Sequence, residues 1–190
     1  MRLPDPPALT TPRLILRPPT REDLPGFYAF GADETAVRHL GGVKSRHEIW
    51  RAACGLAGAW VVDGFGMFSV LRRDTGAWIG RVGPWCPEGW PVREVGYGLL
   101  TEHTGQGYAT EAASACVDYA FDVLGWDSVH HVIAPDNSGS LAVAARLGAR
   151  YIGEVTLPPP YRDTVVGAYG QTRAQWRAGA QRRAGQMDAP

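Results

Sequence analysis

The stretch EVGYGLLTEHTGQGYAT, residues 94–110, decides how the rest of this sequence is interpreted. Its first part alternates apolar residues with glycines, as a strand does, and a polar turn after Leu100 leads to Gly105-Gln106-Gly107. From Ala109 onward, small and apolar residues recur at helical spacing. The stretch therefore predicts a strand, a glycine turn and a helix, whose first N–H groups are free to bind a phosphate.

The spacing of the glycines narrows the choice of phosphate ligand. A dinucleotide fold requires G-x-G-x-x-G, but Gly107 is followed by Tyr108-Ala109-Thr110 without a third glycine. A nucleotide triphosphate loop requires a lysine directly after its last glycine, whereas the only lysine of the chain is Lys44. A pyrophosphate with a long arm along the strand is the simplest remaining candidate, and coenzyme A has that shape.

Three further segments, before and after this stretch, join it in a pattern that spans nearly the whole chain. The matching text is TPRLILRP at 11–18, EVGYGLL at 94–100, GQGYATEA at 105–112, DNSGSLAVAARLGAR at 136–150 and YGQTRAQW at 169–176. In this pattern the sequence resembles the GNAT superfamily of acyl-CoA-dependent N-acyltransferases. Within it, the resemblance is strongest to the branch of the ribosomal-protein N-terminal (RimJ/RimL-like) acetyltransferases and some aminoglycoside acetyltransferases. The superfamily pattern [RQ]-x-x-G-x-[GA] has Arg or Gln where this chain has Thr104, so we expect backbone N–H groups to bind the phosphates.

The resemblance implies a GNAT fold of the α/β (α+β) class. This fold has a mixed, mostly antiparallel sheet of six to seven strands, with helices on both faces. Its fourth and fifth strands, here 94–100 and 128–134, splay apart. We expect one domain over residues 11–178, between a flexible lead at 1–10 and a flexible basic tail at 179–190. The composition of the 190 residues, 45% hydrophobic and 20% charged, agrees with one compact soluble domain.

Local patterns predict several of the elements directly. The alternating run at 13–17 predicts a first strand, and residues 66–83 predict a hairpin that turns at Asp74-Thr75-Gly76. Thr20 with Asp23, and Ser45 with Glu48, have the spacing of capping boxes at helix starts.

Charge and cysteine content exclude several classes of partner and location. The net charge is zero, which gives no electrostatic reason to expect nucleic acid or an anionic membrane as the main partner. The N-terminal residues hold prolines where a signal peptide needs an apolar run, and no stretch reads as a membrane span. The three cysteines are far apart, so we expect reduced thiols in a cytoplasmic protein, with Cys116 on the core face of a helix.

By the resemblance, the acyl-CoA lies in the gap between the splayed strands, with its diphosphate on the glycine turn. The residues that we expect to bind it are Leu99, Leu100, Thr101, Gly105, Gln106, Gly107, Tyr108, Ala109, Thr110 and Asn137. A backbone N–H near Leu99 would polarise the thioester carbonyl. Gly96 and Gly98 would leave the strand bare for close approach of the cofactor, although a bulge or tight helix packing would explain them equally.

The expected catalytic residues are Glu94 and Ser140. Glu94, at the start of the central strand, is the candidate base that takes the proton of the amine directly or through a water. The alternative for Glu94 is a surface carboxylate paired with Arg93 or Arg81. Other candidate bases are Glu102, His103 and Glu111, of which Glu111 is expected on the polar face of its helix beside Asp118 and Asp122.

Ser140 is the candidate acid, because in the resembling family an N-x-x-S segment such as Asn137 to Ser140 places a Ser or Tyr near the cofactor sulfur. Asn137 would bind the pantetheine amides, although helix capping alone would also select these residue types. His130 and His131 point to opposite faces of their strand, and no Cys or carboxylate nearby has ligand spacing, so we expect no metal.

Three hypotheses about function stay open. The first is an acetyl-CoA-dependent N-acetyltransferase that acts on a protein N-terminus or on a small amine such as an aminoglycoside. The second is a non-catalytic acyl-CoA-binding module, and the third is a protein-interaction domain. The loop from Pro84 to Pro91, with Trp85 and Trp90, would either line an apolar acceptor site or pack over a sheet edge. A homodimer would suit the family.

Overall fold

The computed structural model describes residues 7–179, which contain one eight-stranded sheet in the order β1-β2-β3-β4-β5-β6-β8-β7. Every pair of neighbouring strands is antiparallel except β5 and β6, which confirms the expected mixed, mostly antiparallel sheet. The sheet has more strands than the expected six or seven, in part because Leu9–Thr10 forms a short β1 that pairs with β2. This strand falls in the stretch that we expected to be a lead. Residues 180–190 of the expected tail lie outside the described residues.

The strands predicted at 13–17, 66–83, 94–100 and 128–134 are all present among the remaining strands. These remaining strands are β2 Leu14–Arg17, β3 Phe68–Arg72, β4 Trp78–Trp85, β5 Glu94–Leu99, β6 Ser128–Ile133, β7 Arg150–Val155 and β8 Val166–Thr172. The helices are η1 Arg21–Asp23, α1 Leu24–Ala32, α2 Glu34–Val37, α3 Arg46–Val62, η2 Thr101–His103, α4 Tyr108–Asp122, α5 Ser138–Leu147 and α6 Arg173–Ala178. The predicted hairpin at 66–83 is confirmed as β3 and β4.

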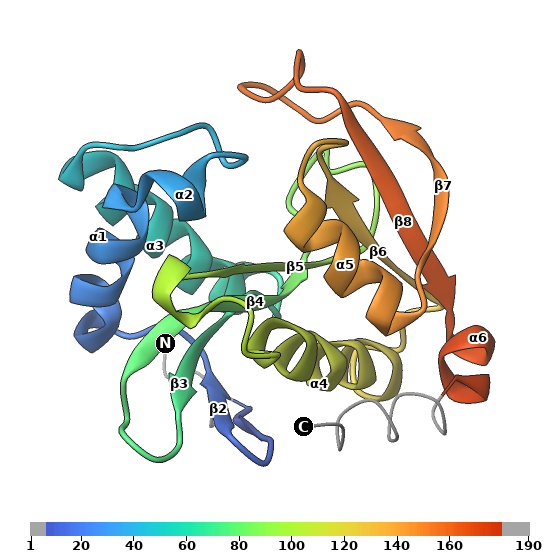
Figure 1. Ribbon diagram of the computed structural model, residues 1–190, viewed down its shortest axis with the longest axis horizontal. Helices are drawn as coiled ribbons and strands as arrows, with labels where there is room; N and C mark the ends of the chain where they lie inside the picture. The colour runs from blue at the N-terminus through green and yellow to red at the C-terminus, as the bar shows by residue number, and fades with distance from the viewer. Residues whose placement is uncertain (1–6, 180–190) are drawn as a thin grey trace.

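The helices divide into groups around the sheet. In Figure 1, α1, α2 and α3 gather at one end of the molecule, α5 lies nearer the middle beside β6, and β5 runs between these two groups of helices. Helix α4 packs its small residues Ala112, Ala113, Cys116 and Ala120 into the main core without exposed surface. Small side chains let the helix pack close to the sheet. This packing fixes the position of the start of α4 near the end of β5. The predicted core position of Cys116 is confirmed.

Both predicted capping boxes are present, at Thr20 with Asp23 and at Ser45 with Glu48. Asp23 is also buried and accepts hydrogen bonds from both terminal nitrogens of Arg17, each at 2.7 Å. The hydroxyl of Ser69 donates to the same carboxylate at 2.8 Å, as does the Thr20 N–H. Burial opposes ionisation, but these hydrogen bonds outweigh it and lower the pKa of Asp23.

The expected splay between residues 94–100 and 128–134 is confirmed as the junction of β5 and β6. In the described part of the chain these parallel strands share one register pair, Glu94 with His130. The Leu100 N–H donates to the Ile79 carbonyl of β4 at 2.9 Å, so the alternation of an antiparallel ladder turns the backbone groups of Tyr97 and Leu99 the other way. They therefore face the gap toward β6, where the ladder has already ended.

None of the helices within residues 7–179 has both the length and the apolar character needed to cross a membrane.

Candidate active site

A cleft of about 2220 Å³ joins the start of α4, the edge of β5 and the space between α1, α3 and β4. Sites for one drug-sized ligand usually measure roughly 300–1,000 Å³. The cleft is therefore large enough for a long ligand together with a second, smaller one. Glu94, Ser140 and all the expected cofactor-binding residues except Leu100 line it.

The glycine turn has the geometry that its sequence predicts. Gly105 and Gly107 have φ angles of 74° and 81°, which L-residues with a side chain rarely adopt. Gly107 is the N-cap of α4 and therefore provides no side-chain acceptor for the first turn of the helix. The N–H groups at the start of this 15-residue helix are thus available to an anion in the cleft.

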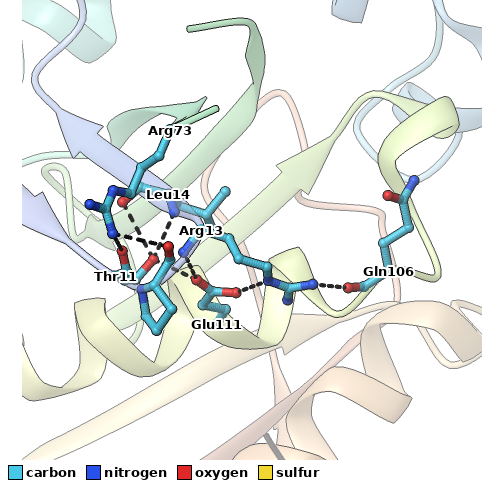
Figure 2. Close-up of polar contacts among 7 residues, drawn as sticks. Thr11, Arg13, Leu14, Arg73, Gln106 and Glu111 are labelled. Carbon is cyan, nitrogen blue, oxygen red and sulfur yellow. Dashed lines mark hydrogen bonds and ion pairs between the residues drawn. The ribbon is translucent and has the colours of Figure 1, made fainter. Parts of the chain in front are cut away.

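Arg13 braces this turn from β2's side, as Figure 2 shows. Its Nε donates to Glu111 Oε2 at 2.6 Å, and its Nη1 donates to the Gln106 carbonyl at 2.9 Å. The guanidinium lies 4.5 Å above the centre of the Tyr108 ring. A positive group therefore stands at the start of α4, although the sequence shows Thr104 at the position where the superfamily pattern has Arg or Gln. The hydroxyl of Thr104 donates instead to the Thr101 carbonyl at 2.8 Å.

The expectation that Glu111 lies on a solvent-facing polar side of α4 is wrong. Glu111 is buried, because the segment before β2 covers this side of the helix. Its carboxylate accepts from the Thr11 hydroxyl at 2.6 Å and from the Arg13 N–H at 2.9 Å, besides the Arg13 side chain. Glu111 therefore ties the N-terminal segment to the glycine turn.

The other alternative bases lie in η2. Glu102 is exposed, and the Nε2 of His103 lies 3.4 Å from its Oε1. His103 lines the cleft at the turn before α4 and packs its ring against Tyr108, at the opposite end from Glu94.

Two of the backbone amides expected to face the cofactor already have partners. The Leu100 N–H donates to β4, and the Thr101 N–H donates to Asp33 Oδ2 at 2.9 Å. The Thr101 hydroxyl donates to the other oxygen of Asp33 at 2.8 Å. Leu99 is the member of this group whose N–H faces the gap.

Glu94 lies where the splay begins, and its side chain is buried against the cleft. The indole Nε1 of Trp90 donates to Glu94 Oε2 at 2.8 Å. Burial raises the pKa of Glu94 to about 7, against the opposing effects of Trp90, the Val132 N–H and the charge of Arg81. Neither Arg93 nor Arg81 forms an ion pair with it among residues 7–179. A carboxylate in this setting exchanges a proton near neutral pH.

Arg81 lines the cleft, whereas the sequence suggested it only as a possible surface partner of Glu94. It lies on β4, and the register of β4 with β5 places it on the same face as Glu94. Its Nη1 contacts Met67 Sδ at 2.5 Å, and its guanidinium carbon lies 5.7 Å from the centre of the Phe30 ring. Burial lowers the pKa of Arg81, while Glu94 and Tyr161 oppose that effect.

Asn137 and Ser140 lie across the gap, at the start of α5. Asn137 caps this helix, since its side chain accepts from the Ser140 N–H at 3.1 Å. The Ser140 carbonyl accepts from the Tyr97 hydroxyl at 2.9 Å, and burial raises the pKa of that phenol. The Ser140 hydroxyl lines the cleft and has no hydrogen-bond partner among the described residues.

His131 spans the same gap nearer to Glu94. Its Nδ1–H donates to the Val95 carbonyl at 2.7 Å, and its ring lies 5.6 Å from that of Tyr97. Burial lowers the pKa of His131 to about 4, so this imidazole is neutral at physiological pH. Within residues 7–179 no three or more His, Cys, Asp or Glu side chains form a cluster able to hold a metal ion.

Gly96 and Gly98 are explained by packing within the protein. A Cβ at Gly96 would lie 2.6 Å from Met67 Cε, and one at Gly98 would lie 2.9 Å from Phe30 Cζ. The bare backbone therefore accommodates side chains of the molecule itself, which is the tight-packing alternative. Trp85 and Trp90 both line the cleft, with ring centres 6.5 Å apart.

Comparisons with known proteins agree with this geometry. The family model described as "Acetyltransferase (GNAT) domain" matches residues 13–150. The uncharacterized N-acetyltransferase YoaA of Bacillus subtilis is 30% identical over 146 residues, covering 75% of this chain and 82% of that protein. YkkB of the same organism is 37% identical over 92 residues, and the match spans 46% of this chain and 54% of that protein.

Solved structures show the same architecture. An acetyltransferase from Agrobacterium tumefaciens strain C58 superposes with a TM-score of 0.78 at 30% identity, covering 88% of this chain and 95% of that one. A putative ribosomal-protein-serine acetyltransferase from Vibrio cholerae gives a TM-score of 0.75 at 22% identity, covering 90% and 99% of the two chains. The second likeness concerns the fold alone. With a family model matched over residues 13–150, a splayed sheet and a glycine turn before α4, this chain belongs to the GNAT acetyltransferases.

Proposed function

We propose that this protein is an acetyl-CoA-dependent N-acetyltransferase that acetylates a primary amine by direct attack of the amine on the thioester. One observation carries the proposal: a buried carboxylate with a pKa of about 7, Glu94, lines the same cleft as the uncapped start of α4. The first feature suits proton transfer from an amine, and the second suits a diphosphate.

The described residues fit coenzyme A at three points. The N–H groups that follow Gly107 would hold the diphosphate, and the guanidinium of Arg13 adds positive charge beside them. The edge of β5 offers the backbone groups of Tyr97 and Leu99 to the amides of the pantetheine arm. When bound, coenzyme A supplies the acetyl group as a thioester, which is already activated for transfer.

Glu94 is assigned the role of the base. An ammonium group has no free lone pair, so the amine must lose a proton before or as its nitrogen bonds to the acetyl carbon. A carboxylate with a pKa of about 7 is present in its charged form in about half of the molecules at neutral pH, and it accepts that proton directly or through a water. An α-amine with a pKa of about 8 needs less help than a lysine amine near 10.4.

Ser140 is assigned the role of the acid. As the carbon–sulfur bond breaks, the sulfur gains an electron pair and requires a proton. The hydroxyl of Ser140 lines the gap and has no partner of its own among the described residues, so it is free to donate there. The Tyr97 hydroxyl lies beside it on the Ser140 carbonyl and is the nearest competitor for this role. The Leu99 N–H, which faces the gap, suits the oxyanion of the intermediate.

The proposal is tested by two measurements on the same protein. Calorimetry with coenzyme A measures binding, and a thiol-release assay with acetyl-CoA measures turnover against peptide N-termini, free amino acids, polyamines and aminoglycosides. We expect binding and release of free thiol with at least one amine class. Binding without release would indicate a non-catalytic module, and the absence of both would indicate an interaction domain.

The roles of the two side chains are tested separately in that assay. Ser140→Ala and Tyr97→Phe each remove one hydroxyl from the gap. We expect Ser140→Ala to lower kcat about tenfold and Tyr97→Phe to lower it less, since acid catalysis contributes on this scale or more. If Tyr97→Phe has the larger effect, the acid is Tyr97 and the assignment to Ser140 is wrong.

A further inference from the structure

The part of the cleft near Glu94 contains two groups of opposite charge, the buried Glu94 and the half-buried Arg81, that do not form an ion pair with each other. Glu94 and Arg81 lie on the same face of β5 and β4, and both line the cleft. Arg81 takes part in no ion pair among residues 7–179; its contacts are the sulfur of Met67 and the ring of Phe30. Each group feels the charge of the other, but neither has a direct ion-pair partner among residues 7–179. Charges removed from water are unfavourable unless they are paired.

Both charged groups converge on Gly96 and Met67. The position of a Cβ on Gly96 lies 2.6 Å from Met67 Cε and 3.1 Å from Glu94 Oε1. Met67 in turn contacts Arg81 Nη1 at 2.5 Å through its sulfur. The carboxylate and the guanidinium therefore both lie close to Met67, an arrangement that suits a ligand with an amine and an anionic group.

Apolar side chains surround the two charges. Phe27, Ile49, Leu56 and Met67 form a buried cluster between α1, α3 and the sheet, and all four also line the cleft. Trp85 packs against the same cluster, next to the indole of Trp90 that bonds Glu94. This lining suits an apolar or aromatic side chain and offers few partners to the many hydroxyl and ammonium groups of a polycation.

We propose that the acceptor is a free α-amino acid with an apolar or aromatic side chain, whose amine lies at Glu94 and whose carboxylate pairs with Arg81. The inference rests on the proposed function, because it names the amine that the enzyme acetylates. A bidentate pair with a carboxylate is the interaction for which a guanidinium is best shaped. Bound in this way, the zwitterion gives both Glu94 and Arg81 a direct ion-pair partner.

The experiment compares L-phenylalanine and L-leucine with their amides, which keep the amine and the side chain but lack the negative charge. A carboxylate beside the amine keeps more of it protonated, so intrinsic reactivity favours the amides. A preference for the free acids must therefore come from binding. We expect kcat/KM with acetyl-CoA to be at least tenfold higher for the free acids than for the amides.

Arg81→Gln removes the counter-charge, and it should lower kcat/KM for the free acids about 100-fold and abolish their preference over the amides. Arg81→Lys should restore part of the preference, because it keeps the charge but loses the bidentate geometry. Arg51→Gln, on the exposed side of α3, is the matched control and should behave as the wild type. The inference is wrong if the wild type uses the amides as well as the acids, or if Arg81→Gln lowers both equally.

Direct binding separates this inference from the proposed function. Thermal unfolding is followed with L-phenylalanine or its amide added, in the wild type and in Arg81→Gln. The acid should raise the Tm of the wild type more than the amide does, and this difference should vanish in Arg81→Gln. If coenzyme A binds but no Tm difference is found, the acceptor inference fails alone. If the difference is found without coenzyme A binding, the proposed function fails alone.

Discussion

Asp23 and Glu94 are buried to a similar extent, with 3% and 7% of their surface exposed, but their pKa values shift in opposite directions. Asp23 accepts from Arg17, Ser69 and the Thr20 N–H, so its pKa is lowered despite burial. Glu94 has a short hydrogen bond from Trp90 and no ion-pair partner in the described chain, so burial dominates and its pKa rises to about 7. The number and charge of the partners therefore decide whether a buried carboxylate stays ionised and stabilises the fold or exchanges protons near neutral pH.

The largest expected effect is the loss of stability when Asp23 is replaced. Asp23→Ala should lower the free energy of unfolding by about 3 kcal/mol, because it leaves the partly buried Arg17 guanidinium without its carboxylate. Urea unfolding of the purified protein measures this. Glu22→Ala, at the exposed neighbouring position, is the matched control and should change stability by less than about 0.5 kcal/mol. A loss below about 1 kcal/mol for Asp23→Ala would show that the cluster contributes little.

The second effect is on the rate. Glu94→Gln should lower kcat about 100-fold, because the amide cannot accept the proton of the amine. In the wild type, kcat/KM should rise with pH through about 7, as Glu94 loses its proton, and the variant should lack this rise. Initial rates of thiol release between pH 5.5 and 8.5 give both values. Glu88→Gln, at an exposed position of the loop before β5, is the control. Equal rates for Glu94→Gln and the wild type would refute the base assignment.

Glu94→Gln, which should lower the rate, should raise the stability of the protein at high pH relative to low pH. Because the pKa of Glu94 is raised in the folded protein, its contribution to stability is fully present below the unfolded pKa near 4.5 and is lost as the pH rises through about 7. The free energy of unfolding of Glu94→Gln minus that of the wild type should therefore be about 2 kcal/mol larger at pH 8 than at pH 5. Denaturant unfolding at the two pH values measures this, and a difference that does not depend on pH would contradict it.

The smallest expected effect concerns the glycine turn, where the third buried carboxylate, Glu111, holds Arg13. Arg13→Gln should weaken coenzyme A binding about fivefold, because the guanidinium is partly exposed and its charge is screened. Calorimetry should show that this loss shrinks as salt is added. Arg21→Gln on the exposed η1 is the control. A loss that does not depend on salt would mean that Arg13 acts by shaping the turn alone.

Local patterns were sufficient for most of the fold. Alternation predicted β2, β3, β4 and β5, and residue types at fixed offsets predicted the caps at Thr20 and Ser45. These features depend on neighbours within a few residues, which the sequence displays directly. The two-residue β1 was missed, because so short a strand has no periodicity of its own.

The site was predicted less completely, because its chemistry depends on contacts between distant segments. Glu111 falls on a polar helical face by spacing alone, and only the packing of Thr11 and Arg13 against it reveals its burial. Arg81 looks like an ordinary hairpin residue until Phe30 and Met67 are placed over β4. The engagement of the Leu100 and Thr101 amides likewise requires Ile79 and Asp33, which lie well before them in the chain.

Side chains form hydrogen bonds across the gap beside β5, from the Tyr97 hydroxyl to the Ser140 carbonyl of α5 and from His131 of β6 to the Val95 carbonyl. Because these hydrogen bonds join the two sides of the gap, they fix its width. The thin, flexible pantetheine arm can enter a gap of fixed width without moving the strands. We therefore expect the rate of coenzyme A association to be limited by diffusion to the entrance of this gap. Acyl groups bulkier than acetyl should bind poorly, because the sides of the gap do not move apart.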